Sequence, residues 1–313
     1  MGAFFLISAY FCPSSLDRKG FRMFVLDKMV RLGIPFLVMT FALGAPLMTV
    51  VTDAIQKKPI DFTVLKTDVT WFIIRLLDFS VLYAVIAQVM PVIKLKMPSP
   101  ILLSIGGFAF GIIYHALALF IPDTYKGVWY SQNGWQFELS LYIWFFIAGI
   151  IGGRNGWLHS IENMPRRTVW FLRILVAAML PIWLALSIVI ITGIVPQPDP
   201  MGLGWLIAGF THGIYPVSMT LMQMQMFYEF FNFTTPFMSA LGEAAYGVYM
   251  VQFWPLTLAI CAYAAILNVG PDLSTLSVGQ IYGGIAFTFF VCHLTLWPSM
   301  WGLRKLPVLS RIL

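Results

Sequence analysis

Residues 279–302 read GQIYGGIAFTFFVCHLTLWPSMWG, and this stretch decides the class of the protein. It holds no Asp, Glu, Lys or Arg, and Arg304 and Lys305 follow it almost at once. About 20 predominantly apolar residues in a helix are enough to cross the hydrocarbon core of a bilayer. Lys and Arg in the short loops beside such a run mark the cytoplasmic side. The stretch therefore predicts a membrane-spanning helix that ends in the cytoplasm.

Similar apolar stretches recur along the rest of the chain. They lie near residues 32–52, 70–92, 101–121, 136–153, 168–192, 203–228 and 240–265. Residues 1–11 (MGAFFLISAYF) are apolar too, but as a helix they rise only about 17 Å, roughly half a span. Every backbone polar group must be satisfied inside lipid, so these stretches must be helices. We predict an all-α, polytopic transmembrane bundle of about nine segments, the first of them partial.

The basic residues fall in every second gap between the apolar stretches. The clusters are Arg18, Lys19, Arg22, Lys28 and Arg31; Lys94 and Lys96; Arg154, Arg166 and Arg167; and Arg304, Lys305 and Arg311. The intervening gaps hold mixed or acidic charge. Because short loops rich in Lys and Arg stay on the cytoplasmic side, this alternation predicts a cytoplasmic C-terminus. We expect an integral protein of the plasma (inner) membrane.

The composition excludes several other classes. The chain is 59% hydrophobic and only 10% charged, whereas soluble domains carry about a quarter charged residues. Its net charge of +6 lies in short loops near anionic headgroups, and no basic stripe interleaved with aromatic residues argues for nucleic acid. Cys12, Cys261 and Cys292 lack metal-ligand spacing, so we expect no metal site.

Residues 17–31 follow a different pattern. Apolar residues recur there at three- and four-residue steps, with basic residues between them. A helix with one apolar and one basic face lies in the plane of the membrane interface. We predict a cytoplasmic, amphipathic interfacial helix over 17–31 within a single membrane domain covering 1–313.

Four stretches carry a resemblance to a known family. They are FFLISAYF (4–11), KMVRLGIP (28–35), the Trp71 to Tyr83 segment WFIIRLLDFSVLY, and AYGVYMVQ (245–252). They resemble, in order and spacing, the FFxxSGYF, basic-x-x-Arg-x-x-x-Pro, WFxxxLLxFSxLY and YxxYxxH stretches of the acyltransferase-3 family of integral membrane O-acyltransferases. The resemblance spans nearly the whole chain.

This resemblance implies ten transmembrane helices. It also implies transfer of an acyl group from a cytoplasmic acyl-CoA, for which we expect acetyl-CoA, to a hydroxyl of an extracytoplasmic glycan or other envelope acceptor. It implies no tightly bound cofactor, and acyl groups other than amino-acyl. The family's catalytic His lies in the first helix, and no His precedes His115 here. Ala9 stands where the family has Gly, and Gln252 where most relatives have His. We expect an N-terminally incomplete chain, inactive as it stands, or an inactive relative.

The resemblance also suggests donor-binding residues. Lys28 and Arg31 lie one turn apart on the cytoplasmic side, and Arg pairs bidentately with the phosphates of a CoA donor. Anchoring to the headgroups of membrane lipids is the alternative for the whole basic cluster. Four ionisable residues inside spans are weak catalytic candidates, since such residues are costly in lipid. They are Arg75, Asp78, His115 and His212. Arg75 and Asp78, at i, i+3, can simply pair, and either histidine can hydrogen-bond across helices.

A polar stripe runs along the seventh complete span. Glu243, Tyr246, Tyr249 and Gln252 recur at three-residue steps, and lipid offers them no partners. Lining a tunnel or joining helices would both satisfy them; the resemblance favours a tunnel, to which we also assign Trp71. A transporter or flippase of a lipid-linked sugar or small solute, and a non-catalytic pseudoenzyme, remain the alternative functions.

Overall fold

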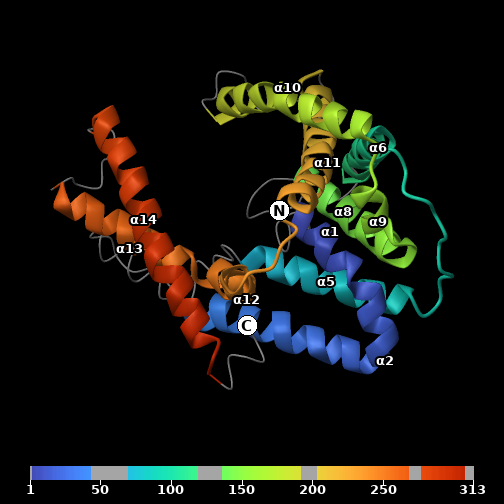
Figure 1. The fold of residues 1–313 in the computed structure, drawn as a ribbon, viewed down its shortest axis with the longest axis horizontal. Coiled ribbons are helices and arrows are strands. Elements are labelled where there is room, and N and C mark those ends of the chain that lie inside the picture. The colour runs from blue at the N-terminus through green and yellow to red at the C-terminus, as the bar shows by residue number, and fades with distance from the viewer. Residues whose placement is uncertain (1, 44–69, 119–135, 192–202, 268–275, 307–313) are drawn as a thin grey trace. The chain divides into compact units, whose positions relative to one another are not determined.

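The computed structural model describes residues 2–43, 70–118, 136–191, 203–267 and 276–306, and within these ranges the chain is helical without strands (Figure 1). The prediction of an all-α fold is confirmed. The elements are α1 (Gly2–Tyr10), α2 (Cys12–Lys28), η1 (Met29–Gly33), α3 (Ile34–Val38), η2 (Met39–Leu43), α5 (Trp71–Ile86), α6 (Pro100–Ala118), α8 (Gln136–Asn155), α9 (Trp157–Glu162), α10 (Arg166–Ile191), α11 (Leu203–Phe231), α12 (Pro236–Val251), α13 (Phe253–Ile266) and α14 (Val278–Leu303). The two elements named η are π-helical.

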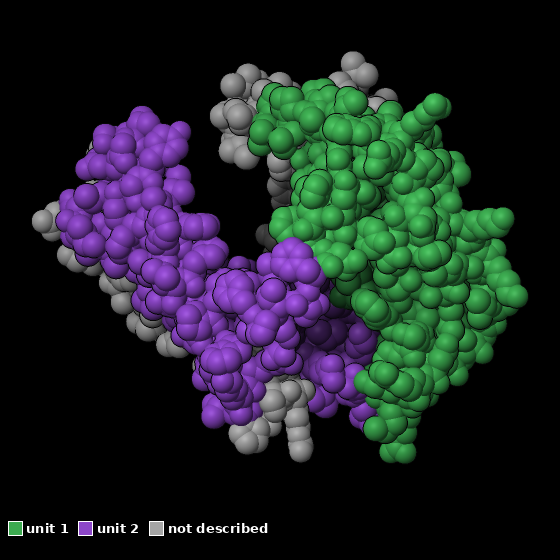
Figure 2. All heavy atoms as spheres, in the orientation of Figure 1, with its two compact units in different colours: residues 1–24, 82–232 green, residues 25–81, 233–313 purple. Residues whose placement is uncertain are grey.

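The chain forms two compact units, coloured separately in Figure 2. The first comprises residues 1–24 and 82–232, and the second residues 25–81 and 233–313. Each unit is therefore built from segments that are distant in sequence. The helix α2 contributes to both units, and it changes direction at Gly20, whose φ of 72° is a conformation that glycine adopts without strain.

In the first unit, α1 lies very close to α8. A Cβ atom built on Gly149 would overlap the backbone carbonyl oxygen of Leu6, and one built on Gly153 would overlap that of Tyr10. The ring of Phe5 stacks on Tyr142, with centroids 4.9 Å apart. Small residues let helix backbones approach closely, which is how helices associate where lipid supplies no hydrophobic driving force.

The remaining helices of the first unit pack in the same way. Gly213 of α11 lies against Phe108 of α6, where an added Cβ would be 3.0 Å from the Phe108 backbone nitrogen. Farther along, α10 and α11 bury a shared apolar cluster of Val176, Met179 and Tyr215. The result is a set of helices held by close backbone contact and apolar packing.

The second unit contains α12, α13 and α14. A capping box begins α14: the Ser277 hydroxyl accepts a hydrogen bond from the Gln280 backbone N–H, and the Gln280 side chain accepts one from the Ser277 N–H. The Tyr263 hydroxyl donates to the Gln280 carbonyl oxygen at 2.8 Å. Ala259, Cys292 and Leu296 form a buried cluster between α13 and α14.

Two expected helices differ from the prediction. The stretch 70–92 ends as α5 at Ile86, and residues 91–99 are not helical. The stretch 240–265 is broken between α12 and α13, which meet at an angle of 65°. Pro255 explains the break, because its missing N–H cannot bond the Val251 carbonyl.

Among the described residues, α14 is long and apolar enough to cross a membrane, and the bent pair α12–α13 would be a second span if the pair counts as one. The predicted number of nine segments remains a prediction. Residues 44–52, 119–121 and 192, which belong to three of the expected spans, lie outside the described residues.

Residues 17–31 form the later part of α2 and the start of η1, and the backbone is not helical at Gly20. Phe24 and Leu32 of its apolar face are buried, while Phe21 and Met29 are exposed. The interfacial position of this helix remains a prediction.

Candidate functional site

The polar stripe on α12 makes contacts within the second unit. The Tyr246 hydroxyl donates a hydrogen bond of 2.8 Å to the backbone carbonyl oxygen of Arg31 in η1. The ring of Tyr249 meets the edge of Phe72 on α5, with centroids 5.4 Å apart and the planes at 70°. The stripe thus brings α12 against the two motif-bearing segments KMVRLGIP and WFIIRLLDFSVLY.

The first residue of the stripe is paired with the end of α14. The Glu243 Oε2 atom lies 3.3 Å from Nη1 of Arg304, the residue that caps α14. The Ser239 hydroxyl is 3.5 Å from the other carboxylate oxygen. Sequence reasoning placed Glu243 in a tunnel and gave Arg304 no role beyond orientation, so this long-range partner was missed.

The predicted donor-binding residues lie at the junction of α2 and η1. The Arg31 side chain is 62% exposed, and its Nε atom is 3.2 Å from Asp27 Oδ1, one turn earlier. Lys28 is half-buried. Asp27 was missed as a partner, although its i, i+4 spacing to Arg31 was readable in the sequence. The hydrogen bond from Tyr246 holds the Arg31 backbone in place. The Arg31 guanidinium, which is mostly exposed, stays accessible to a ligand.

Arg75 and Asp78 form the ion pair that their spacing predicts. Arg75 Nη1 lies 3.4 Å from Asp78 Oδ2, with the arginine side chain 12% exposed. Mutual pairing satisfies both charges without any chemistry. Trp71, assigned to the tunnel, lies one helical turn earlier with its ring edge-on to Phe72 at 6.2 Å.

The two candidate histidines lie in the first unit, His115 on α6 and His212 on α11. Their helices pack together where Gly213 meets Phe108. Their side chains lie outside the described residues, so their catalytic role remains a prediction.

Gln252 lines a cavity of about 850 Å³ within the second unit. Leu256 and Tyr263 of α13 and Gln280, Thr288 and His293 of α14 share this lining, and most of its other residues are apolar. Nδ1 of His293 lies 2.9 Å from the Phe289 carbonyl oxygen, which selects the tautomer protonated on Nδ1. Sequence reasoning gave His293 no role.

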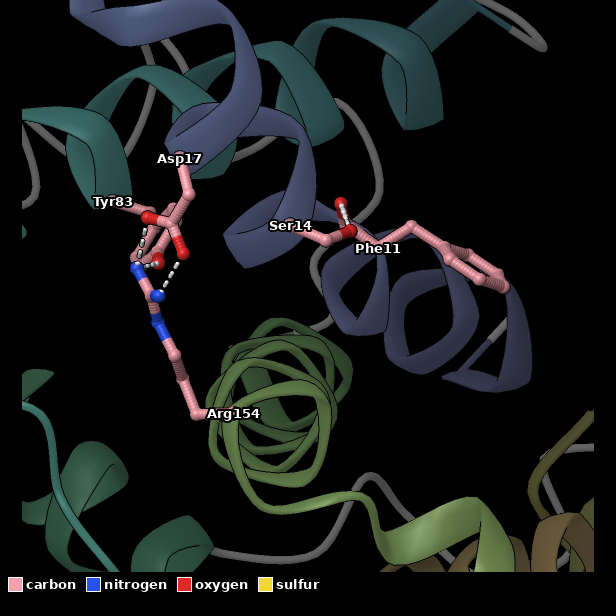
Figure 3. Close-up of polar contacts among 5 residues, drawn as sticks. All are labelled: Phe11, Ser14, Asp17, Tyr83 and Arg154. Carbon is pink, nitrogen blue, oxygen red and sulfur yellow. Dashed lines mark hydrogen bonds and ion pairs between the residues drawn. The ribbon is translucent and has the colours of Figure 1, made fainter.

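A second polar cluster, also missed, lies in the first unit (Figure 3). Arg154, at the end of α8, donates through both terminal nitrogens to the Asp17 carboxylate, and its Nη2 atom also donates to the Tyr83 hydroxyl at 3.1 Å. The hydrogen bonds to Asp17 raise the pKa of the Arg154 guanidinium. The cluster ties α2, α5 and α8 together, and the described residues contain no group of His, Cys, Asp and Glu that could hold a metal ion.

Comparison with known proteins agrees with the motifs. A family model described as "Acyltransferase domain" matches residues 1–305. The chain belongs to the acyltransferase-3 family. No curated protein and no solved structure matches the chain. Membership supports a membrane acyltransferase-type function, and members of the acyltransferase-3 family are typically embedded in membranes.

Three of the four acyltransferase-3 motifs belong to the second unit. They are KMVRLGIP across η1, AYGVYMVQ at the end of α12, and WFIIRLLDFSVLY on α5, of which all but the last two residues lie in this unit. The fourth, FFLISAYF, forms most of α1 in the first unit. The contacts of Tyr246 and Tyr249 therefore join three family motifs into one local arrangement.

Proposed function

We propose that the protein is a membrane O-acyltransferase that moves an acyl group, acetyl in the simplest case, from a cytoplasmic acyl-CoA to a hydroxyl of an extracytoplasmic glycan or another envelope acceptor. We place it in the plasma membrane with its C-terminus in the cytoplasm. The observation that carries the proposal is the meeting of three family motifs at α12, where Tyr249 contacts Phe72 and Tyr246 anchors the backbone of the accessible Arg31.

An acyl-CoA donor carries several phosphates, so its binding site needs cations. A guanidinium pairs bidentately with phosphate, and Arg31 keeps most of its side chain accessible. Lys28, half-buried and one turn earlier, adds a second positive charge. Asp27 holds the Arg31 side chain from the flank, which limits the rotamer freedom that binding would remove.

In the proposed reaction the acceptor hydroxyl oxygen attacks the thioester carbonyl carbon. A C–O bond forms and the C–S bond breaks; a base takes the hydroxyl proton, and the CoA thiolate leaves and is protonated. The base must be positioned within hydrogen-bond reach of the hydroxyl. The family's first-helix His has no match here before His115, so we assign the role of the base to no residue.

Acetyl-CoA binding to the full chain in sealed vesicles of defined orientation tests the proposal. We expect saturable binding when the face bearing the C-terminus is exposed to the ligand, and none from the opposite face. Absence of binding from both faces would contradict the donor assignment.

One observation favours a second candidate function. Transporters use broken helices and polar groups near the middle of the membrane, and the 65° break at Gln252 opens on the cavity between α12, α13 and α14. A transporter or flippase would move a lipid-linked sugar or small solute in protein-containing vesicles without acyl-CoA. Flux that is independent of acyl-CoA would favour this function over acyl transfer.

A further inference from the structure

Arg304, at the C-terminal end of α14, has a guanidinium nitrogen that the described structure leaves unsatisfied. Nη1 is buried and makes no hydrogen bond of acceptable geometry. The Glu243 carboxylate, 3.3 Å away, supplies an ion pair only. A buried donor without a hydrogen bond is unfavourable, and each such group in a native protein calls for an explanation such as an absent ligand.

Two arginines meet one turn of α12. Glu243 pairs with Arg304, and three residues later Tyr246 donates to the backbone of Arg31. Residues three apart on a helix are neighbours on the same side. All of these residues belong to the second unit, so a single turn of α12 contacts η1 at Arg31 and the C-terminal end of α14 at Arg304.

The charges around Arg304 leave room for one more anion. Glu243 is its ion-pair partner, and Lys305, the next residue, lies with Nζ over the Trp301 ring, 3.3 Å from its centroid. Arg31, held by the same turn of α12, shares its own charge with Asp27. The Arg304 side chain is 32% exposed, so a ligand from the aqueous side can reach its exposed part, and the buried Nη1 becomes accessible only once the Glu243 carboxylate moves away.

We propose that Arg304 binds a phosphate group and that Glu243 occupies the guanidinium in its absence. The phosphate would take the unsatisfied Nη1 donor and displace the carboxylate, because a guanidinium offers phosphate two parallel charge-assisted hydrogen bonds. This inference rests on the proposed function. It adds Arg304 to Lys28 and Arg31 as a further residue that contacts the phosphates of the donor. The phosphate bound by Arg304 can also be that of an anionic lipid headgroup, because its chemistry is the same.

Substitutions of Arg304 and of Glu243 should change the affinity for coenzyme A in opposite directions, which distinguishes a phosphate-binding role from a structural one. Coenzyme A is titrated calorimetrically into the purified full chain in zwitterionic detergent. We expect Arg304→Gln to weaken binding about tenfold or more, the equivalent of a charge-assisted hydrogen bond, and Glu243→Gln to strengthen it. A merely structural ion pair would make both variants less stable and leave affinity unchanged.

The pair Arg173 and Glu229 on α10 and α11 provides matched controls, because it is another Arg–Glu ion pair, with Arg173 Nη2 2.5 Å from Glu229 Oε2 in the first unit. Arg173→Gln and Glu229→Gln change the net charge equally and should leave the affinity for coenzyme A unchanged. Arg304→Lys keeps the charge and loses the two-pronged geometry, so it should bind with intermediate affinity even if Arg304→Gln fails to fold.

The outcomes are distinguishable. Failure of the wild-type chain to bind coenzyme A would refute the proposed donor site itself. Coenzyme A binding that neither Arg304→Lys nor Glu243→Gln alters would overturn the contact of Arg304 with the donor and leave the donor site standing; if bound lipid is unaltered as well, the phosphate role of Arg304 is overturned. Native mass spectrometry with phosphatidylglycerol identifies the source: loss of bound lipid in Arg304→Lys, with coenzyme A binding intact, would assign the phosphate to a headgroup.

Discussion

The close contact of α1 with α8 gives the sharpest stability prediction. A Cβ added at Gly153 would overlap the Tyr10 carbonyl oxygen and lie 3.0 Å from its carbon and 3.2 Å from its Cα. All three atoms are backbone, so no side-chain rotation relieves the clash. Ordinary carbon contacts lie at about 3.5–4.0 Å, and the two helices must separate by roughly 0.5 Å or more.

Gly153→Ala should therefore destabilise the protein by about 1–3 kcal/mol, the usual cost of overpacking, reduced by at most about 1 kcal/mol of gained helix propensity. Gly242→Ala on α12 is the matched control, because nothing lies within 4 Å of its added Cβ. In Gly242→Ala only the higher helix propensity of Ala acts, and it should stabilise the protein by about 0.5–1 kcal/mol.

Thermal unfolding of both variants in one detergent, followed by circular dichroism, measures this difference. We expect Gly153→Ala to unfold below the wild-type temperature and Gly242→Ala at or above it. Equal unfolding temperatures for the two variants would refute the close approach of α1 and α8.

Three further predictions concern polar contacts. Tyr246→Phe should lower stability by about 0.5–1.5 kcal/mol by removing a hydrogen bond, and should weaken coenzyme A binding because η1 loses its anchor; unchanged affinity would contradict that link. Arg154→Gln should lower the unfolding temperature, and Asp17→Asn should add little to it, because both remove the same interaction. The hydrogen bond from Gln225 and the nearby Arg173 lower the pKa of Glu229, so its stabilising effect is present above its ordinary pKa and is lost as pH falls through the lowered value. Wild-type and Glu229→Gln unfolding temperatures should differ at pH 7 and converge in acid; a constant difference would contradict this.

The sequence predicted the all-helical fold because apolar stretches in lipid have no alternative to helices. It also predicted the Arg75–Asp78 pair, since the two residues are neighbours along one helix. The 65° break between α12 and α13 was not predicted, because its size depends on how α13 packs against α14. The end of α5 at Ile86 was missed for a related reason, since hydropathy does not distinguish an apolar loop from a helix.

The long-range pairs could not be predicted from the sequence. Glu243–Arg304 and Arg154–Asp17 join residues far apart in the chain, and their partners are selected by the fold. The basic clusters were readable as charge, but which guanidinium stays accessible depends on tertiary contacts. Arg154 is engaged by two side chains, whereas Arg31 keeps most of its side chain accessible.

The most direct test of the account is equilibrium binding of coenzyme A to the purified chain and to its Lys28→Gln/Arg31→Gln double variant. Arg22→Gln serves as control, because it removes a cation from the same basic cluster at a position to which we assign no donor contact. We predict that the double variant loses at least tenfold in affinity while Arg22→Gln binds like the wild type. Equal affinity in the wild type and the double variant would contradict the donor site at the junction of α2 and η1.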